Sequence, residues 1–431
     1  MRHSAFQAFS EALSHHNAGR LSEAAAWYGL ALKARPNYPE AHLNLGAVFR
    51  GQGKNNKAAE HFRKALKCRP EYPEAFNNLG TAIRDLGDVR GAIAAYRQAV
   101  KLRPDFADAH EGLGLAFQDL GDYDRAVESY RSALVADPAH GRSHGRLAAV
   151  LRKQGKLTEA FGHARRATLL LPLWAEAWTV FAAVLRSLGA PDVAVVACER
   201  AAELGDPAAR HLLAAYRGQT TDRPPQEYVA SLFDKYAATF EADLVGRLQY
   251  STPQKLRNMV DGACECRRFT HALDLGCGTG LMAEAFLDIA PRVVGVDLSS
   301  KMIDLAKAKN IYDRLKVSDI VYFMNHECDV FDIIFAGDVF CYLGDLGIVF
   351  SAVAKRAMPN AVFAFATEVD GGSRAFTLTE SGRYRHAQEY IENCLAMIGA
   401  RILAWEIETI RYQEGKPCAG HHVVALLNVG V

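Results

Sequence analysis

The stretch that decides the fold of this chain is HALDLGCGTG, residues 271–280. A short apolar run ends near Asp274, and three glycines follow at Gly276, Gly278 and Gly280. Because glycine has no Cβ, such a loop lets a ligand approach the backbone closely. An apolar strand that leads into a glycine loop is typical of a nucleotide-binding α/β domain.

Short apolar segments alternate with segments of helical periodicity after residue 226, which predicts a strand–helix alternation in a mostly parallel, doubly wound sheet. The last two strands should flank a Gly-Lys-Pro turn at Gly415. The expected strands are THALDL (270–275), RVVGV (292–296), LKVS (315–318), FDIIFA (331–336), AVFAFAT (361–367), RILAWEIETIRY (401–412) and HHVVALLN (421–428).

The loop does not read as a dinucleotide loop, since its third glycine comes one residue earlier than in G-x-G-x-x-G. Asp274 on the strand would repel a pyrophosphate but would attract an ammonium group. S-adenosylmethionine carries an amino-acid end and no phosphate, so the loop favours this cofactor. Binding of NAD and a plain tight turn are the alternatives.

Three further acids follow later strands and match the parts of that cofactor. Asp297 can accept both ribose hydroxyls in a two-oxygen clamp, with Leu298 and Met302 over the adenine. Asp319 can accept the adenine amino group beside Ile320. Asp338 ends the fourth strand at the carboxyl edge, where such sheets bind ligands.

The first half of the chain repeats every 34 residues, which predicts a stack of helix pairs. Small residues would let helices approach, glycine would break each pair, and proline would begin the turn between pairs. The columns are Pro36, Pro70, Pro104, Pro138 and Pro172; Gly19, Gly53, Gly87, Gly121, Gly155 and Gly189; Ala24, Ala58, Ala92, Ala126, Ala160 and Ala194; and Ala31, Ala65, Ala99, Ala133, Ala167 and Ala201.

These features predict a domain of six repeats over residues 5–208 and an α/β domain over 226–431. Between them, residues 209–225 should form a capping helix for the repeats and a proline-rich joint.

The repeat pattern resembles the tetratricopeptide repeat. Residues 226–431 resemble the class I, Rossmann-like S-adenosylmethionine-dependent methyltransferases, especially the trans-aconitate and ubiquinone-biosynthesis group, and the whole chain resembles bacterial fusions of the two. The resemblance implies a seven-stranded sheet with a reversed last hairpin. It also implies a lid over residues 228–245 with Phe233, Tyr236 and Phe240 near the cofactor, although core packing explains their helical spacing equally well. The predicted cofactor contacts are Asp274, Gly276, Cys277, Gly278, Gly280, Asp297, Leu298, Met302, Asp319, Ile320, Asp338 and Tyr236.

Methyl transfer is a direct displacement, and a base is needed only if the acceptor carries a proton. Val339 and Phe340 stand where DNA-type N-methyltransferases carry two prolines, which disfavours that acceptor type and favours O- or carboxyl transfer. Candidate acceptor-side residues are Tyr342, Tyr384 and His386, with a structural role for His386 as the alternative. We assign no metal to His326, His421 or His422.

The first helix of each repeat is expected to line a concave groove that holds a protein or peptide. Forked arginine donors suit carboxylates and asparagines suit a peptide backbone. The alternative is that these arginines pair with acids such as Asp85 and Asp119 inside the array. The predicted groove residues are Asn44, Asn78, Arg50, Arg84, Arg152 and Arg186.

Charge and cysteine usage bound the remaining possibilities. The net charge is +1, which indicates no nucleic-acid partner, but residues 1–218 carry +7 and residues 219–431 carry −6. The two halves could therefore attract each other. Nine cysteines without framework spacing, Cys264 and Cys266 being the only close pair, fit a reduced, cytoplasmic protein. A repeat scaffold with a vestigial or regulatory cofactor-binding domain remains the alternative to an active enzyme.

Overall fold

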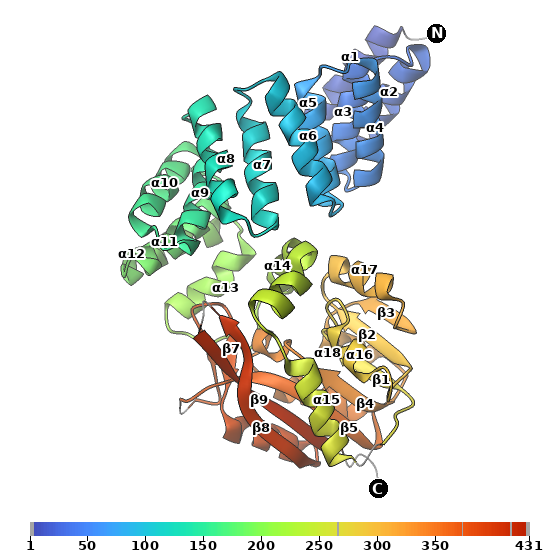
Figure 1. Cartoon of the computed structure of the whole chain (residues 1–431), viewed down its shortest axis with the longest axis vertical. Coiled ribbons are helices and arrows are strands. Elements are labelled where there is room, and N and C mark those ends of the chain that lie inside the picture. Colours follow the sequence, from blue (N-terminus) through green and yellow to red (C-terminus); the bar gives the residue numbers. More distant parts are fainter. Residues whose placement is uncertain (1–3, 265–266, 373, 414–415, 428–431) are drawn as a thin grey trace. The chain divides into compact units, whose positions relative to one another are not determined.

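A computed structural model describes residues 4–264, 267–372, 374–413 and 416–427. Its contacts divide the chain into two units, Met1–Leu204 and Gly205–Val431 (Figure 1). Cys266, Gly415 and Asn428, which the sequence interpretation used, lie outside the described residues. None of the helices built from the described residues is long and apolar enough to cross a membrane.

Unit 1 contains the predicted helix pairs, and in the first five pairs the second helix also packs on the first helix of the next pair. First helices of successive repeats also touch, as α3 does with α5 and α5 with α7. The helices are α1 (Ala5–Asn17), α2 (Leu21–Ala34), α3 (Pro39–Gly51), α4 (Asn55–Cys68), α5 (Pro73–Asp85), α6 (Val89–Leu102), α7 (Ala107–Asp119), α8 (Tyr123–Ala136), α9 (Gly141–Lys153), α10 (Leu157–Leu170), α11 (Ala175–Ser187) and α12 (Pro191–Glu203).

The small-residue columns have the roles that the period predicts. All twelve alanines of the two columns are completely buried, so the helices meet at these positions. The six column glycines have φ between 72° and 90°, a left-handed conformation that turns the chain inside each pair. The 34-residue period therefore fixes both the helix boundaries and the close helix contacts.

A second recurring feature is a hydrogen bond at the fourth residue of the first helix in four of the repeats. There a side-chain ring N–H donates to the carbonyl of the proline six residues earlier. This bond satisfies a carbonyl in the turn between repeats. The pairs are His42 with Pro36, His110 with Pro104, His144 with Pro138, and Trp178 with Pro172, at 2.8–3.1 Å.

Unit 2 is an α/β domain. Its helices are α13 (Pro207–Tyr216), α14 (Gln226–Tyr236), η1 (Ala237–Thr239), η2 (Ala242–Arg247), α15 (Thr252–Ala263), α16 (Leu281–Phe286), α17 (Ser300–Lys309), α18 (Ile320–His326), η3 (Phe340–Tyr342), α19 (Gly347–Arg356) and α20 (Gln388–Met397). Its strands are β1 (Ala272–Leu275), β2 (Val293–Asp297), β3 (Arg314–Val317), β4 (Phe331–Ala336), β5 (Ala357–Val369), β6 (Phe376–Leu378), β7 (Tyr384–His386), β8 (Ala400–Gln413) and β9 (Lys416–Leu427).

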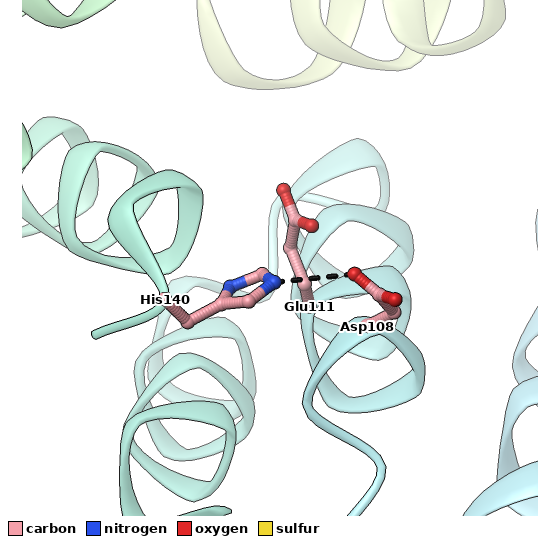
Figure 2. A group of neighbouring side chains, drawn as sticks. All are labelled: Asp108, Glu111 and His140. Carbon is pink, nitrogen blue, oxygen red and sulfur yellow. Dashed lines mark hydrogen bonds and ion pairs between the residues drawn. The ribbon is translucent and has the colours of Figure 1, made fainter. Parts of the chain in front are cut away.

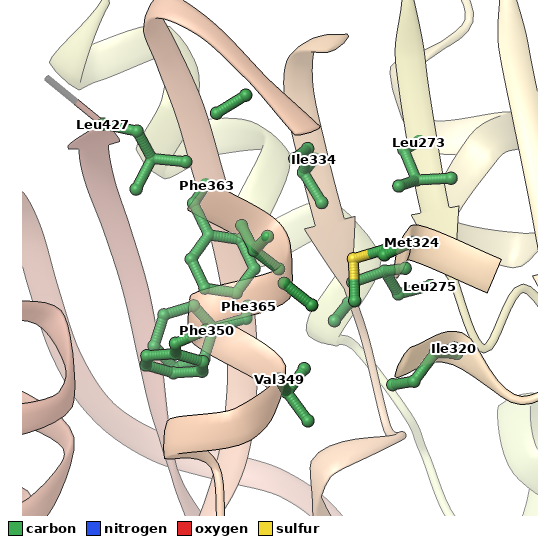
Figure 3. Close-up of a cluster of buried hydrophobic side chains, with 14 of the residues drawn as sticks. Leu273, Leu275, Ile320, Met324, Ile334, Val349, Phe350, Phe363, Phe365 and Leu427 are labelled. Atoms are coloured by element: carbon green, nitrogen blue, oxygen red, sulfur yellow. The ribbon is translucent and has the colours of Figure 1, made fainter. Parts of the chain in front are cut away.

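The main sheet has the predicted seven strands. Strands β3, β2, β1, β4 and β5 are parallel in that order, and β9 then runs antiparallel to β5 and pairs with β8. Side chains alternate between two cores: Phe363 and Phe365 of β5 lie in one, and Val362 and Ala364 lie in the other. Figure 3 shows the first core, where Phe350 of α19 covers these phenylalanines. Because both faces are buried there, β1, β2 and β4 read as nearly continuous apolar runs.

One element was not predicted. Strands β6 and β7 form a short hairpin, and β7 extends the sheet by pairing with the end of β5 at Glu368 and Val369. Three-residue strands carry too little pattern for prediction from sequence.

The segment 209–225, predicted to be a capping helix and a joint, makes several hydrogen bonds within unit 2. Helix α13 belongs to unit 2, where the His211 ring donates to the Gly382 carbonyl at 3.0 Å. The Thr221 hydroxyl lies 2.6 Å from that of Tyr384. The Asp222 carbonyl accepts the N–H groups of Gly344 and Asp345. We call residues 205–225 the strap, because these bonds fix it to unit 2.

Close packing at the repeat glycines gives a stability prediction. A Cβ on Gly80 would lie 2.8 Å from Tyr96, whose ring is buried and also faces Gly112, so it has little room to move. Gly80→Ala should destabilise unit 1 by about 2 kcal/mol through overpacking. Gly162→Ala is the control: its site is exposed, open and helical, so it should stabilise by about 0.5 kcal/mol. Urea unfolding measures both, and equal effects would contradict this packing.

The strap gives a second prediction. A fragment of residues 205–431 should be more stable than one of residues 226–431, because removing the strap exposes the buried Tyr384 and leaves Gly344 and Asp345 without their carbonyl acceptor. Thermal unfolding of the two fragments at equal concentration tests this. Identical midpoints would mean that the strap is only a tether.

Candidate functional site

A pocket opens in unit 2 where the carboxyl ends of β1, β2 and β4 meet, and its empty space is about 980 Å³, including the solvent at its mouth. The predicted residues that line it are Gly276, Cys277, Gly278, Asp297, Leu298, Asp319, Ile320, Asp338 and Tyr342. It is also lined by Arg223, Pro224, Gln226, Val229, Phe233, Phe240, Leu244, Tyr250, Thr279, Leu281, Met282, Gly337, Val339 and Leu343.

The glycine loop and Asp297 form one hydrogen-bonded unit. One Asp297 oxygen accepts the N–H of Gly278 at 2.9 Å, and the other accepts that of Ser299 at 2.8 Å. Each oxygen keeps a lone pair for another donor. Gly278 has φ +52°, and a Cβ there would extend from the loop toward Phe240 in the pocket wall. The loop is thus preformed beside a carboxylate that can accept two hydroxyls.

Asp274 lies behind the loop and is not among the residues that line the pocket. It is fully buried, and one oxygen accepts the Tyr312 hydroxyl at 2.7 Å. The other oxygen has no hydrogen-bond partner among the described residues. Burial raises the pKa of this carboxyl to about 7. The unpaired oxygen is a place where a donor on a ligand or a water would be favourable.

The structure also gives the positions of two side chains predicted to bind the adenine. Met302 is fully buried in α17 and is not among the residues that line the pocket. Asp319 lines the pocket, but one of its oxygens caps α18 by accepting the Tyr322 N–H at 2.9 Å. Leu298 and Ile320 line the pocket as expected.

Gly280 and Tyr236 lie just outside the lining. Gly280 has φ +100° and lies directly before α16, so a glycine is needed there for the left-handed turn into the helix. Tyr236 meets Phe240 edge-on, with ring centroids 5.5 Å apart.

The predicted lid, residues 228–245, contributes Phe233 and Phe240 to the pocket. Polar contacts hold it in place. Asp234 accepts the Ser299 hydroxyl at 2.6 Å, and Glu241 pairs with Lys309 at 2.6 Å. The lid is therefore fastened to α17, the helix that begins directly after the Asp297 loop.

A buried cluster of four charges lies behind the acceptor side of the pocket, and the sequence interpretation missed three of its members. Asp338 accepts from Arg383 and Arg411 at 2.8 Å each. Glu368 accepts from Arg383 at 2.6 Å and also pairs with Arg411. Although burial opposes ionisation, the two arginines lower the pKa of both carboxyls. The cluster is balanced, with two positive and two negative charges.

Tyr342 is the one predicted acceptor-side residue that lines the pocket. Its hydroxyl accepts from Arg383 at 2.8 Å, and its ring meets Phe233 edge-on at 5.1 Å. Burial raises its pKa, so the phenol stays protonated near neutral pH. It can position an acceptor by donating a hydrogen bond, but it does not supply a phenolate.

Tyr384 and His386, the other predicted acceptor-side residues, are not among the residues that line the pocket. Both are fully buried in β7. The Tyr384 hydroxyl bonds to Thr221 of the strap. His386 lies 2.6 Å from the Thr367 hydroxyl, and its other nitrogen contacts the Leu343 and Gly344 carbonyls. Burial lowers its pKa to about 4, so it is a neutral, structural histidine.

The missed residues had only weak sequence signals. Arg383 directly precedes the strand that carries Tyr384 and His386. Glu368 extends the apolar β5 run as a buried acid, a departure that could have been noticed because a buried charge needs a partner. Arg411 lies on a different strand far along the chain, and nothing local marks it.

The residues present suit S-adenosylmethionine. Asp297 keeps free lone pairs, the glycine loop leaves space that a Cβ would enter, and Leu298, Ile320 and Phe240 provide apolar and aromatic walls. Among the described residues, the pocket lining contains no lysine and one cationic side chain, Arg223. It therefore offers no pair of cations that would bind a pyrophosphate.

Family models match parts of both units. Tetratricopeptide-repeat families match residues 13–53, 48–83, 77–138 and 113–172, and the family described as "Methyltransferase domain" matches residues 273–365. Among solved structures, "Crystal structure of MamA" shares 28% identity at a TM-score of 0.34, covering 37% of this chain and 93% of the other.

Two curated relatives are O-methyltransferases. The malonyl-[acyl-carrier protein] O-methyltransferase of Salmonella typhimurium is 27% identical over 34% of this chain, which spans about half (55%) of that protein. The ubiquinone biosynthesis O-methyltransferase of Nitrobacter winogradskyi is 29% identical, over 38% of this chain and 67% of the relative. The chain thus combines tetratricopeptide repeats with a domain of the methyltransferase family.

Proposed function

We propose that unit 2 binds S-adenosylmethionine and transfers its methyl group to an oxygen of the acceptor, a hydroxyl or a carboxylate. The observation that carries this proposal is the preformed unit of Gly278 and Asp297 beside Asp319 in one pocket. The bound cofactor would supply a methyl group already activated by its sulfonium. Asp297 would hold the ribose hydroxyls, and Asp319 the adenine amino group.

The acceptor side of the pocket supports transfer without a strong base. Phe233, Leu244, Met282 and Tyr250 form largely apolar walls that exclude water. Asp338 is the nearest acid, and two arginines stabilise its ionised form, which makes it a weak base. Alignment of the acceptor against the methyl group would then supply most of the rate. The two curated relatives described above are both O-methyltransferases, which supports the same proposal.

For the repeats we propose a protein-binding role, with a peptide held by the first helices and presented as acceptor or partner. Asn44, Asn78, Arg50, Arg152 and Arg186 remain the proposed contacts. We no longer include Arg84 among the proposed contacts, because its guanidinium pairs with Asp119 at 2.6 Å inside the array, as the alternative interpretation predicted. Arg152 is therefore the better arginine to test.

Cofactor binding tests the first proposal. In calorimetry on the full chain, Asp297→Ala should weaken S-adenosylmethionine binding by roughly 1.5–3 kcal/mol, the range for hydrogen bonds to a charged group. Asp304→Ala, an exposed acid on α17, is the matched control and should bind like the wild type. Thermal unfolding checks that both variants are folded. Unchanged affinity in Asp297→Ala would refute the ribose assignment.

Transfer kinetics test the second proposal. Radiolabelled methyl transfer into fractionated lysate would first identify the acceptor, and a lack of any transfer would favour the regulatory scaffold. On that acceptor, Arg152→Ala should raise KM and leave cofactor affinity unchanged, with added salt reducing the difference from wild type. Arg165→Ala, an exposed arginine on a second helix, is the control. Equal KM values for all three proteins at low salt would rule out recruitment through Arg152.

A further inference from the structure

Three side chains with metal-ligating atoms meet between the fourth and fifth repeats, far along the chain from the pocket residues. Asp108 and Glu111 lie on the first turns of α7, and His140 is the residue directly before α9. One ligand atom from each lies within 4.8 Å of the others. Figure 2 shows the Glu111 carboxylate beside the contact between His140 and Asp108.

Glu111 is the unusual member of this group. Its side chain is only 7% exposed, yet no described residue gives it a hydrogen bond or an ion pair. His140, Arg146 and Arg142 lie near enough to act on it electrostatically, and the Arg146 guanidinium is bonded to Glu176 at 2.5 Å. A carboxylate this deeply buried would gain from a cation bonded to it directly.

His140 is oriented as a metal ligand usually is. Its Nδ1 lies 2.8 Å from the hydroxyl of Ser143, which is completely buried. If Nδ1–H donates to that oxygen, the lone pair of Nε2 faces Asp108 Oδ1 at 3.1 Å. Two acceptors at that distance repel unless a proton or a metal ion lies between them. Ligating histidines commonly donate their other ring N–H to a fixed acceptor in this way.

We propose that Asp108, Glu111 and His140 bind one divalent transition-metal ion, such as Zn²⁺ or Mn²⁺, between α7 and α9. One imidazole and two carboxylates form a nitrogen–oxygen donor set that these ions accept. Ligand atoms around such an ion lie roughly 3.0–3.4 Å apart, given metal–ligand bonds of about 2.1 Å. His140 and Asp108 already have this spacing, and the carboxylate of Asp108, whose side chain is 60% exposed, can rotate to complete it.

Three protein ligands leave at least one coordination position for water or for an oxygen or nitrogen of a bound partner. The ion would join two repeats and offer a coordination point on the repeat surface. This inference does not depend on methyl transfer, so the failure of one proposal leaves the other intact.

The test uses untagged, chelator-treated full-length protein titrated with Co²⁺, followed by absorption and by calorimetry. We expect one ion per chain with a visible spectrum of nitrogen and oxygen ligands and without the thiolate band that a cysteine site would give. Glu111→Gln and His140→Gln should each weaken binding by about tenfold or more. His163→Gln is the matched control, since His163 lies 4.0 Å from Glu159 but belongs to no such three-ligand group among the described residues, and it should bind like wild type.

Folding of the variants is checked by thermal unfolding. If Glu111→Gln fails to fold, Asp108→Asn gives the same test at an exposed side chain, and it should also lose affinity. Absence of Co²⁺ and Zn²⁺ binding at millimolar concentration would overturn the proposal. So would a thiolate spectrum, or affinity that Asp108→Asn and His140→Gln leave unchanged. Binding of a lysine-rich peptide that needs Glu111 but no metal would show that an ammonium group fills the place instead.

Discussion

The pairing of Asp338 and Glu368 with Arg383 and Arg411 is the interaction on which the site in unit 2 depends. Asp338 lies two residues after β4 and its side chain is 17% exposed in the pocket wall, while Glu368 lies near the end of β5 and is 4% exposed. Removing one partner of such a buried group costs about 3–5 kcal/mol, because it leaves a charge uncompensated. Arg411 comes from β8, and Arg383 directly precedes β7. The inner wall of the pocket therefore forms only when these late elements have folded onto the sheet.

The same cluster limits the chemistry of the acceptor side. Because each arginine contacts both acids, neither carboxylate is free to take up a proton near neutral pH. Tyr342, bound to Arg383, keeps its proton as well. The pocket thus contains polar groups that can orient a ligand, but those that contact the cluster are poor bases. Such a site suits a reaction whose driving force is carried by the incoming cofactor.

The sequence was sufficient wherever a local rule acts on neighbouring residues. The alanine and glycine columns are forced by close helix approach and by left-handed turns, and the structure has them buried or at positive φ as predicted. The β4 strand has the predicted bounds because a fully buried parallel strand must be apolar throughout. Asp297 follows from its place at the end of β2, since the carboxyl edge of a parallel sheet is where ligands bind.

The sequence was insufficient where distant residues decide the outcome. In β7 the burial alternates, so whether Tyr384 or Arg385 faces the core depends on pairing with β5, which no local pattern shows. The end of the strap has the composition of a stiff, proline-rich joint, yet Thr221 and Asp222 bond to residues more than a hundred positions away. Arg84 occupies a position where arginine recurs along the repeats, but it forms an ion pair with Asp119 of the next repeat.

The repeats extend this contrast, because a periodic scaffold places different side chains in equivalent positions. Thr179, Gly145 and Asn77 occupy the same place in their helices as Glu111, and only Glu111 brings a negative charge there. The buried alanine columns recur in every repeat, whichever residue stands at this position. A charge at Glu111 is informative because the scaffold does not require one there.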